Sequence, residues 1–166
     1  MARQLWVLRH AEAEPHGARA DAERRLTERG ESQARTAGIA LRRLGVRFEA
    51  VIYSPKARAQ ATAELAAAEW NGAQRKLLKA YPPLAGGFGA EQALEAAAEV
   101  GSDGRLLIVG HEPDLSGLVG ALTGARAEIK KGGLAVVRLQ GAAGELAALL
   151  RPRELALIAG SPGEGD

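Results

Sequence analysis

The chain alternates short apolar segments, each about one strand long, with longer segments whose apolar residues recur at helical spacing. This alternation predicts a mostly parallel central sheet with helices on both faces, which is an α/β three-layer sandwich. The continuous run Leu-Leu-Ile-Val within 105–110 is typical of a strand buried on both faces. The pattern of the last two apolar segments predicts a hairpin, so the sheet should be mixed. The expected strands are 4–9, 48–53, 75–79, 105–110, 134–139 and 145–150.

Helix signals separate the expected strands. Thr27 is a suitable N-cap for the first helix, and Gly45 is suited to end it. The length of 166 residues fits one domain, which we expect to span residues 1–159, with residues 160–166 as a flexible tail. The expected helices are 27–44, 56–70, 91–100, 114–122 and 154–159, with a Pro/Gly-rich loop over 81–89.

Composition excludes several classes of function. The chain has no Cys, which excludes disulfides, thiolate catalysis and Cys-ligated metals. Its three His are far apart in sequence, so we expect no metal site and no cofactor. A net charge of +2, and a basic run no longer than Lys130-Lys131, give no case for nucleic acid or a membrane surface. Without an apolar run of signal-peptide or membrane-spanning length, a cytoplasmic location is the expectation.

Polar residues suited to binding a phosphoryl group follow three of the expected strands. Arg9-His10 ends the first strand, Ser54-Pro55 follows the second, and His111 follows the strand 105–110. Arg58 lies in the first turn of the helix after Ser54. Ligands of open α/β sheets bind beyond the carboxyl ends of the strands, so these side chains could share one pocket.

The residue types fit phosphoryl transfer. Arg stays charged and pairs with two phosphate oxygens at once. A neutral imidazole can attack phosphorus and form a phosphohistidine, which divides one displacement into two easier steps. A second imidazole can donate to the charge that develops on the oxygens.

At these residues the sequence resembles the histidine phosphatase superfamily, also called the phosphoglycerate mutase-like family. Leu8-Arg9-His10-Ala11 matches its opening Arg-His-Gly, with Ala in place of Gly. Leu26-Thr27-Glu28-Arg29-Gly30 matches Leu-Thr-x-x-Gly, and Ser54-Pro55-Lys56-Ala57-Arg58-Ala59 matches Ser-Pro-x-x-Arg-Ala. Gly110-His111 matches the second catalytic His. Within this superfamily, the chain resembles the small SixA type of phosphohistidine phosphatase in three features: its length, the short loop before Arg25-Leu26-Thr27 and the sequence of residues 131–137.

The resemblance implies roles for named residues. It implies that His10 is the nucleophile, that Arg9 and Arg58 clamp the phosphate, and that His111 stabilises the transferring group. Arg25 is either surface charge or a substrate contact, and Ser54 is either a helix N-cap or a ligand contact. The implied substrate is a phosphorylated protein, such as a histidine phosphotransfer domain or a phosphocarrier. The alternatives are a small phosphate ester and a non-catalytic phosphate-binding or interaction module.

Two departures from the family pattern bear on the substrate. Ala61 stands where the family often has Gln, which predicts the loss of a local hydrogen bond. The stretch 84–89 has no carboxylate, whereas mutases and many ester phosphatases carry an acid there. An alkoxide leaving group needs a proton donor, but an imidazole departs more easily. The missing acid therefore favours phosphohistidine over a sugar phosphate.

His10 must be neutral to attack, so its second ring nitrogen needs a partner that keeps its proton, such as a backbone carbonyl. We therefore expect activity to fall at acid pH, as His10 becomes protonated. A rate that stayed flat to well below pH 5 would contradict His10 as the nucleophile.

Overall fold

Six strands form one mixed sheet in the computed structural model, which describes residues 2–161. The strand order is β3-β2-β4-β1-β5-β6. The first four are parallel to one another, and β5 and β6 complete the sheet as an antiparallel hairpin beside β1. The predicted α/β fold and its closing hairpin are confirmed. The strands are β1 (Gln4–Arg9), β2 (Ala50–Tyr53), β3 (Leu78–Ala80), β4 (Arg105–Gly110), β5 (Leu134–Gln140) and β6 (Ala143–Leu150).

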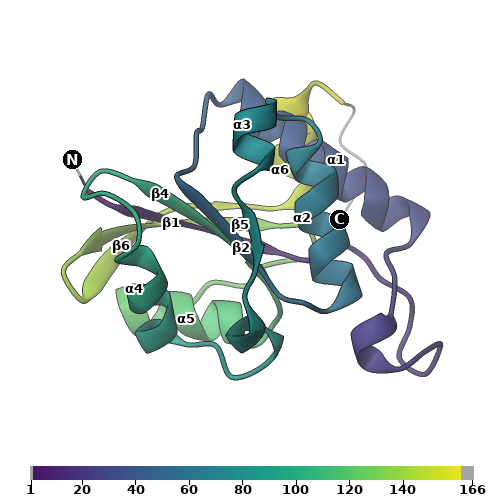
Figure 1. Cartoon of the computed structure of the whole chain (residues 1–166), viewed down its shortest axis with the longest axis horizontal. Coiled ribbons are helices and arrows are strands. Elements are labelled where there is room, and N and C mark those ends of the chain that lie inside the picture. Colours follow the sequence, from purple (N-terminus) through teal and green to yellow (C-terminus); the bar gives the residue numbers. More distant parts are fainter. Residues whose placement is uncertain (1, 162–166) are drawn as a thin grey trace.

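Helices cover both faces of the sheet (Figure 1). The helices α1, α2 and α6 lie on one face, and α4 and α5 lie on the other. None of the helices within residues 2–161 has the length and apolarity needed to cross a membrane. The helices are α1 (Glu28–Arg43), α2 (Ala57–Ala67), α3 (Gly72–Arg75), α4 (Ala90–Ala97), α5 (Asp114–Thr123) and α6 (Pro152–Ala159), with short 3-10 turns η1 (Asp21–Glu23) and η2 (Pro82–Ala85).

The prediction of a strand over 75–79 is wrong in its position. Asn71 caps the short helix α3 by accepting a hydrogen bond from the backbone N–H of Gln74, and the strand begins only at Leu78. The amide of Gln74 also bonds both the N–H and the carbonyl of Phe48, which fixes this turn against the segment before β2. Of the predicted tail, Gly160 and Ser161 form the C-terminal cap of α6, and 162–166 lie outside the described residues.

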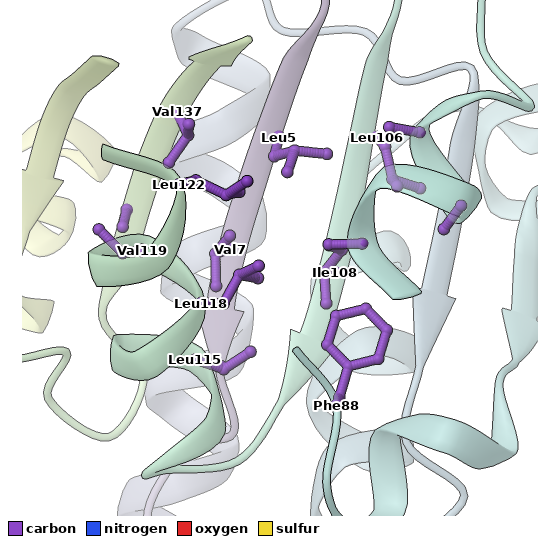
Figure 2. Packing of buried hydrophobic residues seen from close by; sticks show 14 of the residues in the cluster. Leu5, Val7, Phe88, Leu106, Ile108, Leu115, Leu118, Val119, Leu122 and Val137 are labelled. Carbon is purple, nitrogen blue, oxygen red and sulfur yellow. The ribbon is translucent and has the colours of Figure 1, made fainter. Parts of the chain in front are cut away.

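The core lies in two layers, one on each face of the sheet. In β4, Leu106 and Ile108 belong to the layer under α4 and α5, whereas Leu107 and Val109 belong to the layer under α1, α2 and α6. Figure 2 shows the first layer, where side chains of α5 pack against those of β1 and β4. All four of these β4 side chains are fully buried, as the uninterrupted apolar run predicts.

Gly30 lets the segment after β1 lie directly on the first turn of α1. A Cβ built at Gly30 would lie 1.9 Å from the carbonyl oxygen of Glu12. The same oxygen accepts the backbone N–H of Thr27 at 3.1 Å, and the hydroxyl of Thr27 caps the helix by accepting the N–H of Gly30. The Leu-Thr-x-x-Gly motif therefore anchors the loop that follows His10.

Replacement of Gly30 by Ala should lower the free energy of unfolding by about 2–3 kcal/mol, because the added methyl group overlaps a backbone oxygen. The measurement is urea denaturation. Gly117 is the matched control, since it lies within α5 and nothing lies within 4 Å of an added Cβ. Gly117→Ala should stabilise the protein by about 0.5–1 kcal/mol through helix propensity. Equal stability of Gly30→Ala and the wild type would contradict the tight contact.

Candidate active site

The pairing of β1 with β4 brings the two predicted catalytic His together. Arg9 and Gly110 are register partners at the carboxyl ends of these parallel strands, and the N–H of His10 donates to the carbonyl of Gly110 at 3.0 Å. His10 and His111 therefore emerge next to each other, with their ring centroids 5.2 Å apart and their planes inclined at 53°. Both side chains are buried.

A backbone carbonyl sets the tautomer of His10. Its Nδ1 lies 2.8 Å from the carbonyl oxygen of Ala11, which can only accept a hydrogen bond. In the neutral ring the proton therefore lies on Nδ1, and Nε2 keeps its lone pair. This is the partner that the sequence analysis required for a neutral, attacking imidazole.

Ser54 holds the second imidazole. Its Oγ lies 2.7 Å from Nε2 of His111 and also accepts the backbone N–H of Lys56 at 3.3 Å. The end of β2 places Ser54 here, because its own N–H donates to the carbonyl of Val109 in β4. When the Ser54 hydroxyl donates to Nε2, the proton of His111 lies on Nδ1. No side-chain hydrogen bond caps α2, so the N-cap alternative for Ser54 is not realised; its contact with a ligand stays a prediction.

Backbone carbonyls hold the two predicted phosphate-binding Arg. NH1 of Arg9 donates to the carbonyl of Ile129 at 3.0 Å, and NH1 of Arg58 donates to the carbonyl of Asp21 at 2.7 Å. The Nε atom of each guanidinium is buried and has no hydrogen-bond partner. Burial lowers the pKa of both guanidinium groups, and neighbouring carboxylates partly oppose this effect.

Within residues 2–161, three buried side-chain nitrogens lack a partner: Nε of Arg9, Nε of Arg58 and Nδ1 of His111. A buried donor without a partner costs roughly 1–3 kcal/mol, so such groups mark places where a ligand supplies the acceptor. All three belong to the residues that the sequence predicts to bind phosphate. Among the same residues, no cluster of three His, Cys, Asp or Glu is arranged to hold a metal ion.

Asp21 on η1 is a functional candidate that sequence reasoning missed. Its carboxylate accepts hydrogen bonds from Lys56 at 3.0 Å, from Arg24 at 3.1 Å and from Arg58 at 3.4 Å. These cations, with the Lys56 bond as the largest effect, hold the pKa of Asp21 far below its usual range. No spacing in the sequence indicates this role, because Asp21 lies in a loop far from Arg58 along the chain.

The structure brings Arg24 to the site rather than Arg25. The side chain of Arg24 is buried, and its positive charge helps to lower the pKa values of Arg58 and His111. Arg25 is exposed, and only its backbone N–H is engaged, with Glu14 at 2.7 Å. The alternation along this extended segment turns the side chain of Arg25 outward, so it is surface charge in the free protein, and its contact with a substrate stays a prediction.

Thr62 joins the loop after His10 to α2. Its buried hydroxyl donates to the carbonyl of Arg58 at 2.7 Å and accepts the N–H of Ala11 at 3.0 Å. The neighbouring Ala61 packs against a small apolar cluster with Ala11. The hydroxyl of Thr62 therefore connects α2 to the loop after His10, although its neighbour Ala61 has no polar side chain.

Burial is the main cause of low pKa values for both imidazoles. It lowers the pKa of His10 to about 3, with the positive charges of His111, Arg58 and Arg9 acting in the same direction. It lowers the pKa of His111 to about 4, with Arg58 and Lys56 contributing. Both rings are therefore neutral at physiological pH. The predicted fall in activity should therefore begin at a lower pH than an ordinary imidazole would give, so a rate that stays flat to just below pH 5 does not argue against His10 as the nucleophile.

Known proteins share this fold and part of this sequence. Residues 5–79, which contain His10 and Arg58, match the model of the histidine phosphatase superfamily, branch 1. An uncharacterised protein of Picosynechococcus sp. is 34% identical over 140 residues, which cover 81% of this chain and 84% of that protein.

Solved structures extend the match to nearly the whole chain. The protein histidine phosphatase SixA in complex with tungstate superposes with a TM-score of 0.81 at 25% identity, covering 92% of this chain and 99% of that one. Alpha-ribazole phosphatase from Shigella flexneri has a TM-score of 0.73 at 20% identity, with coverages of 98% and 100%. Phosphoglycerate mutase from Bacillus anthracis has a TM-score of 0.75 at 17% identity, with coverages of 93% and 96%. The last two show the shared fold, and the sequence matches show that this chain belongs to the histidine phosphatase superfamily.

Proposed function

We propose that this protein hydrolyses phosphohistidine on a protein through a phosphorylated His10. The observation that carries the proposal is the set of three unpaired buried nitrogens on Arg9, Arg58 and His111, next to an imidazole whose tautomer leaves Nε2 free. Two positive guanidinium groups and one neutral donor suit a phosphoryl group. The likeness to SixA, a protein histidine phosphatase, supports the same substrate class.

The proposed reaction has two displacements on phosphorus. In the first, Nε2 of His10 forms a bond to phosphorus while the bond from phosphorus to the substrate imidazole nitrogen breaks, and the substrate imidazole, which carries a proton on its other ring nitrogen, leaves as a neutral group. In the second, a water oxygen attacks phosphorus, the bond to Nε2 breaks, and inorganic phosphate leaves with the protons of that water. Arg9, Arg58 and His111 stabilise the charge on the phosphoryl oxygens in both steps.

The carboxylates around the site suit an imidazole leaving group better than an alkoxide. Asp21 is bound by three cations that keep it ionised, so it is a poor proton donor at neutral pH. Glu12 accepts hydrogen bonds from Thr27 and Arg29, and Glu112 accepts from the N–H of Ser116. An alkoxide needs a proton as it departs, whereas an imidazole departs without a strong acid.

The decisive experiment follows the release of inorganic phosphate from a protein that carries phosphohistidine. We expect the wild type to release it and His10→Ala to be slower by at least about a thousandfold, because the attacking atom is lost. His16→Ala is the matched control, since His16 is exposed in the loop after β1, and its rate should equal that of the wild type. A phosphoryl label should also appear on His10 after a rapid quench. No label and no release would favour a non-catalytic phosphate-binding module.

A small phosphate ester is the second candidate substrate. It is favoured by the fold shared with alpha-ribazole phosphatase and phosphoglycerate mutase. A panel of phosphosugars and nucleotides separates the two candidates. Efficient hydrolysis of an ester, with phosphohistidine left intact, would overturn the proposed substrate but not the role of His10.

The low pKa values of both imidazoles can be tested without a substrate. In an NMR titration of the free protein, we expect His10 and His111 to titrate below pH 5, with His10→Ala used for assignment. The unfolded chain binds these protons from about pH 6.5, where its imidazoles titrate. The free energy of unfolding should therefore decrease as the pH falls from about 6.5 toward these folded values. A midpoint near 6.5 for His10 would contradict its burial.

Asp21 should act as a positioning residue, because it holds NH1 and NH2 of Arg58 and so directs Nε away from itself. Asp21→Asn should lower kcat by about tenfold through a displaced guanidinium. The affinity for tungstate should rise by about fivefold, because one negative charge near the anion is removed. Glu23→Gln is the control, since it removes a charge from the same turn, and it should change kcat little. An unchanged kcat for Asp21→Asn would exclude the positioning role.

A further inference from the structure

A pocket lined mainly by residues with charged side chains adjoins the candidate active site and shares Arg9 with it. Its volume is about 380 Å³. It lies between the start of α1, the segment before β5 and the start of α6, and it contains the pair Lys130-Lys131 that the sequence analysis left without a role. The lining residues are Arg9, Glu12, Arg29, Gln33, Glu128, Lys130, Lys131 and Pro152.

The charges in this pocket leave an excess of cations. It holds four basic and two acidic side chains. Glu12 pairs with Arg29 at 3.1 Å, and Glu128 pairs with Lys130 at 3.0 Å. Within residues 2–161, Lys131 forms no ion pair. The unbalanced positive charge therefore lies on Lys131 and on Arg9, whose Nε is also unpaired.

The backbone fixes Lys131 close to the nucleophile. Gly132, the next residue, donates its N–H to the carbonyls of Arg9 at 3.2 Å and His10 at 3.0 Å. Gly132 has a φ of +76°, which an L side chain rarely adopts, so a tight turn at this point keeps Lys131 beside the end of β1. Because Arg9 belongs to the candidate site and also lines this pocket, Lys131 lies on the side of the site that Arg9 forms.

We propose that this pocket is a recognition subsite for an acidic side chain, Asp or Glu, that flanks the phosphorylated residue of a protein substrate. The inference rests on the proposed function, and it adds the sequence context that the enzyme prefers. Lys131 is exposed and is paired with no carboxylate among the described residues 2–161, so it offers a point charge to a partner surface. In this proposal Arg9 orients the phosphoryl group, and Lys131 favours substrate proteins that carry an acidic side chain beside the phosphorylated residue.

The test measures binding, so that it does not depend on turnover. Two peptides carry a non-hydrolysable phosphonate analogue of phosphohistidine, flanked on both sides by Asp in one and by Asn in the other. The wild type should bind the Asp peptide about fivefold more tightly, which is the range of an exposed ion pair. The preference should vanish in Lys131→Gln and be reversed in Lys131→Glu. It should also fade at high salt, because exposed charges are screened.

Lys76→Gln is the matched control, because Lys76 is an exposed Lys that precedes β3 at the opposite edge of the sheet, and it should keep the preference. Equal binding of both peptides by the wild type, or a preference that survives Lys131→Gln, would overturn the subsite. Failure of the proposed function would look different: both peptides would bind, but phosphohistidine would not be hydrolysed.

Discussion

The register between β1 and β4 is the constraint on which the site depends. Because Arg9 is paired with Gly110, the residues that follow, His10 and His111, leave the sheet side by side. A slip of one residue would turn each side chain of β1 to the other face and separate the two imidazoles. The strand cannot slip easily, because β4 and β5 bind it on both sides and its core side chains are fully buried.

Site residues that directly follow a buried strand could be predicted from the sequence. Arg9, His10, Ser54 and His111 each come after an apolar run, and parallel strands deliver such residues to one edge. Arg58 could be predicted from its place in the first turn of the next helix. The pattern of apolar segments in the sequence is therefore sufficient to predict those site residues that the strands of the sheet hold in place.

Residues placed by the long loop after β1 could not be predicted. The choice of Arg24 over Arg25 depends on a hydrogen bond from the Arg24 guanidinium to the carbonyl of Glu14 and on a bridge between Ala13 and Leu26. Asp21 reaches Arg58 only because this loop folds back over α2. Such contacts join side chains to backbone atoms that are distant in the sequence, so no repeating pattern of residues indicates them. The low pKa of His10 likewise follows from burial, which no local pattern reveals.

The hydroxyl of Thr62 has a mechanical consequence for the site. It bonds the carbonyl of Arg58 on one side and the N–H of Ala11 on the other. A displacement of α2 would therefore reach the backbone beside His10 through this one hydroxyl group, which links the position of the Arg58 guanidinium to that of the imidazole.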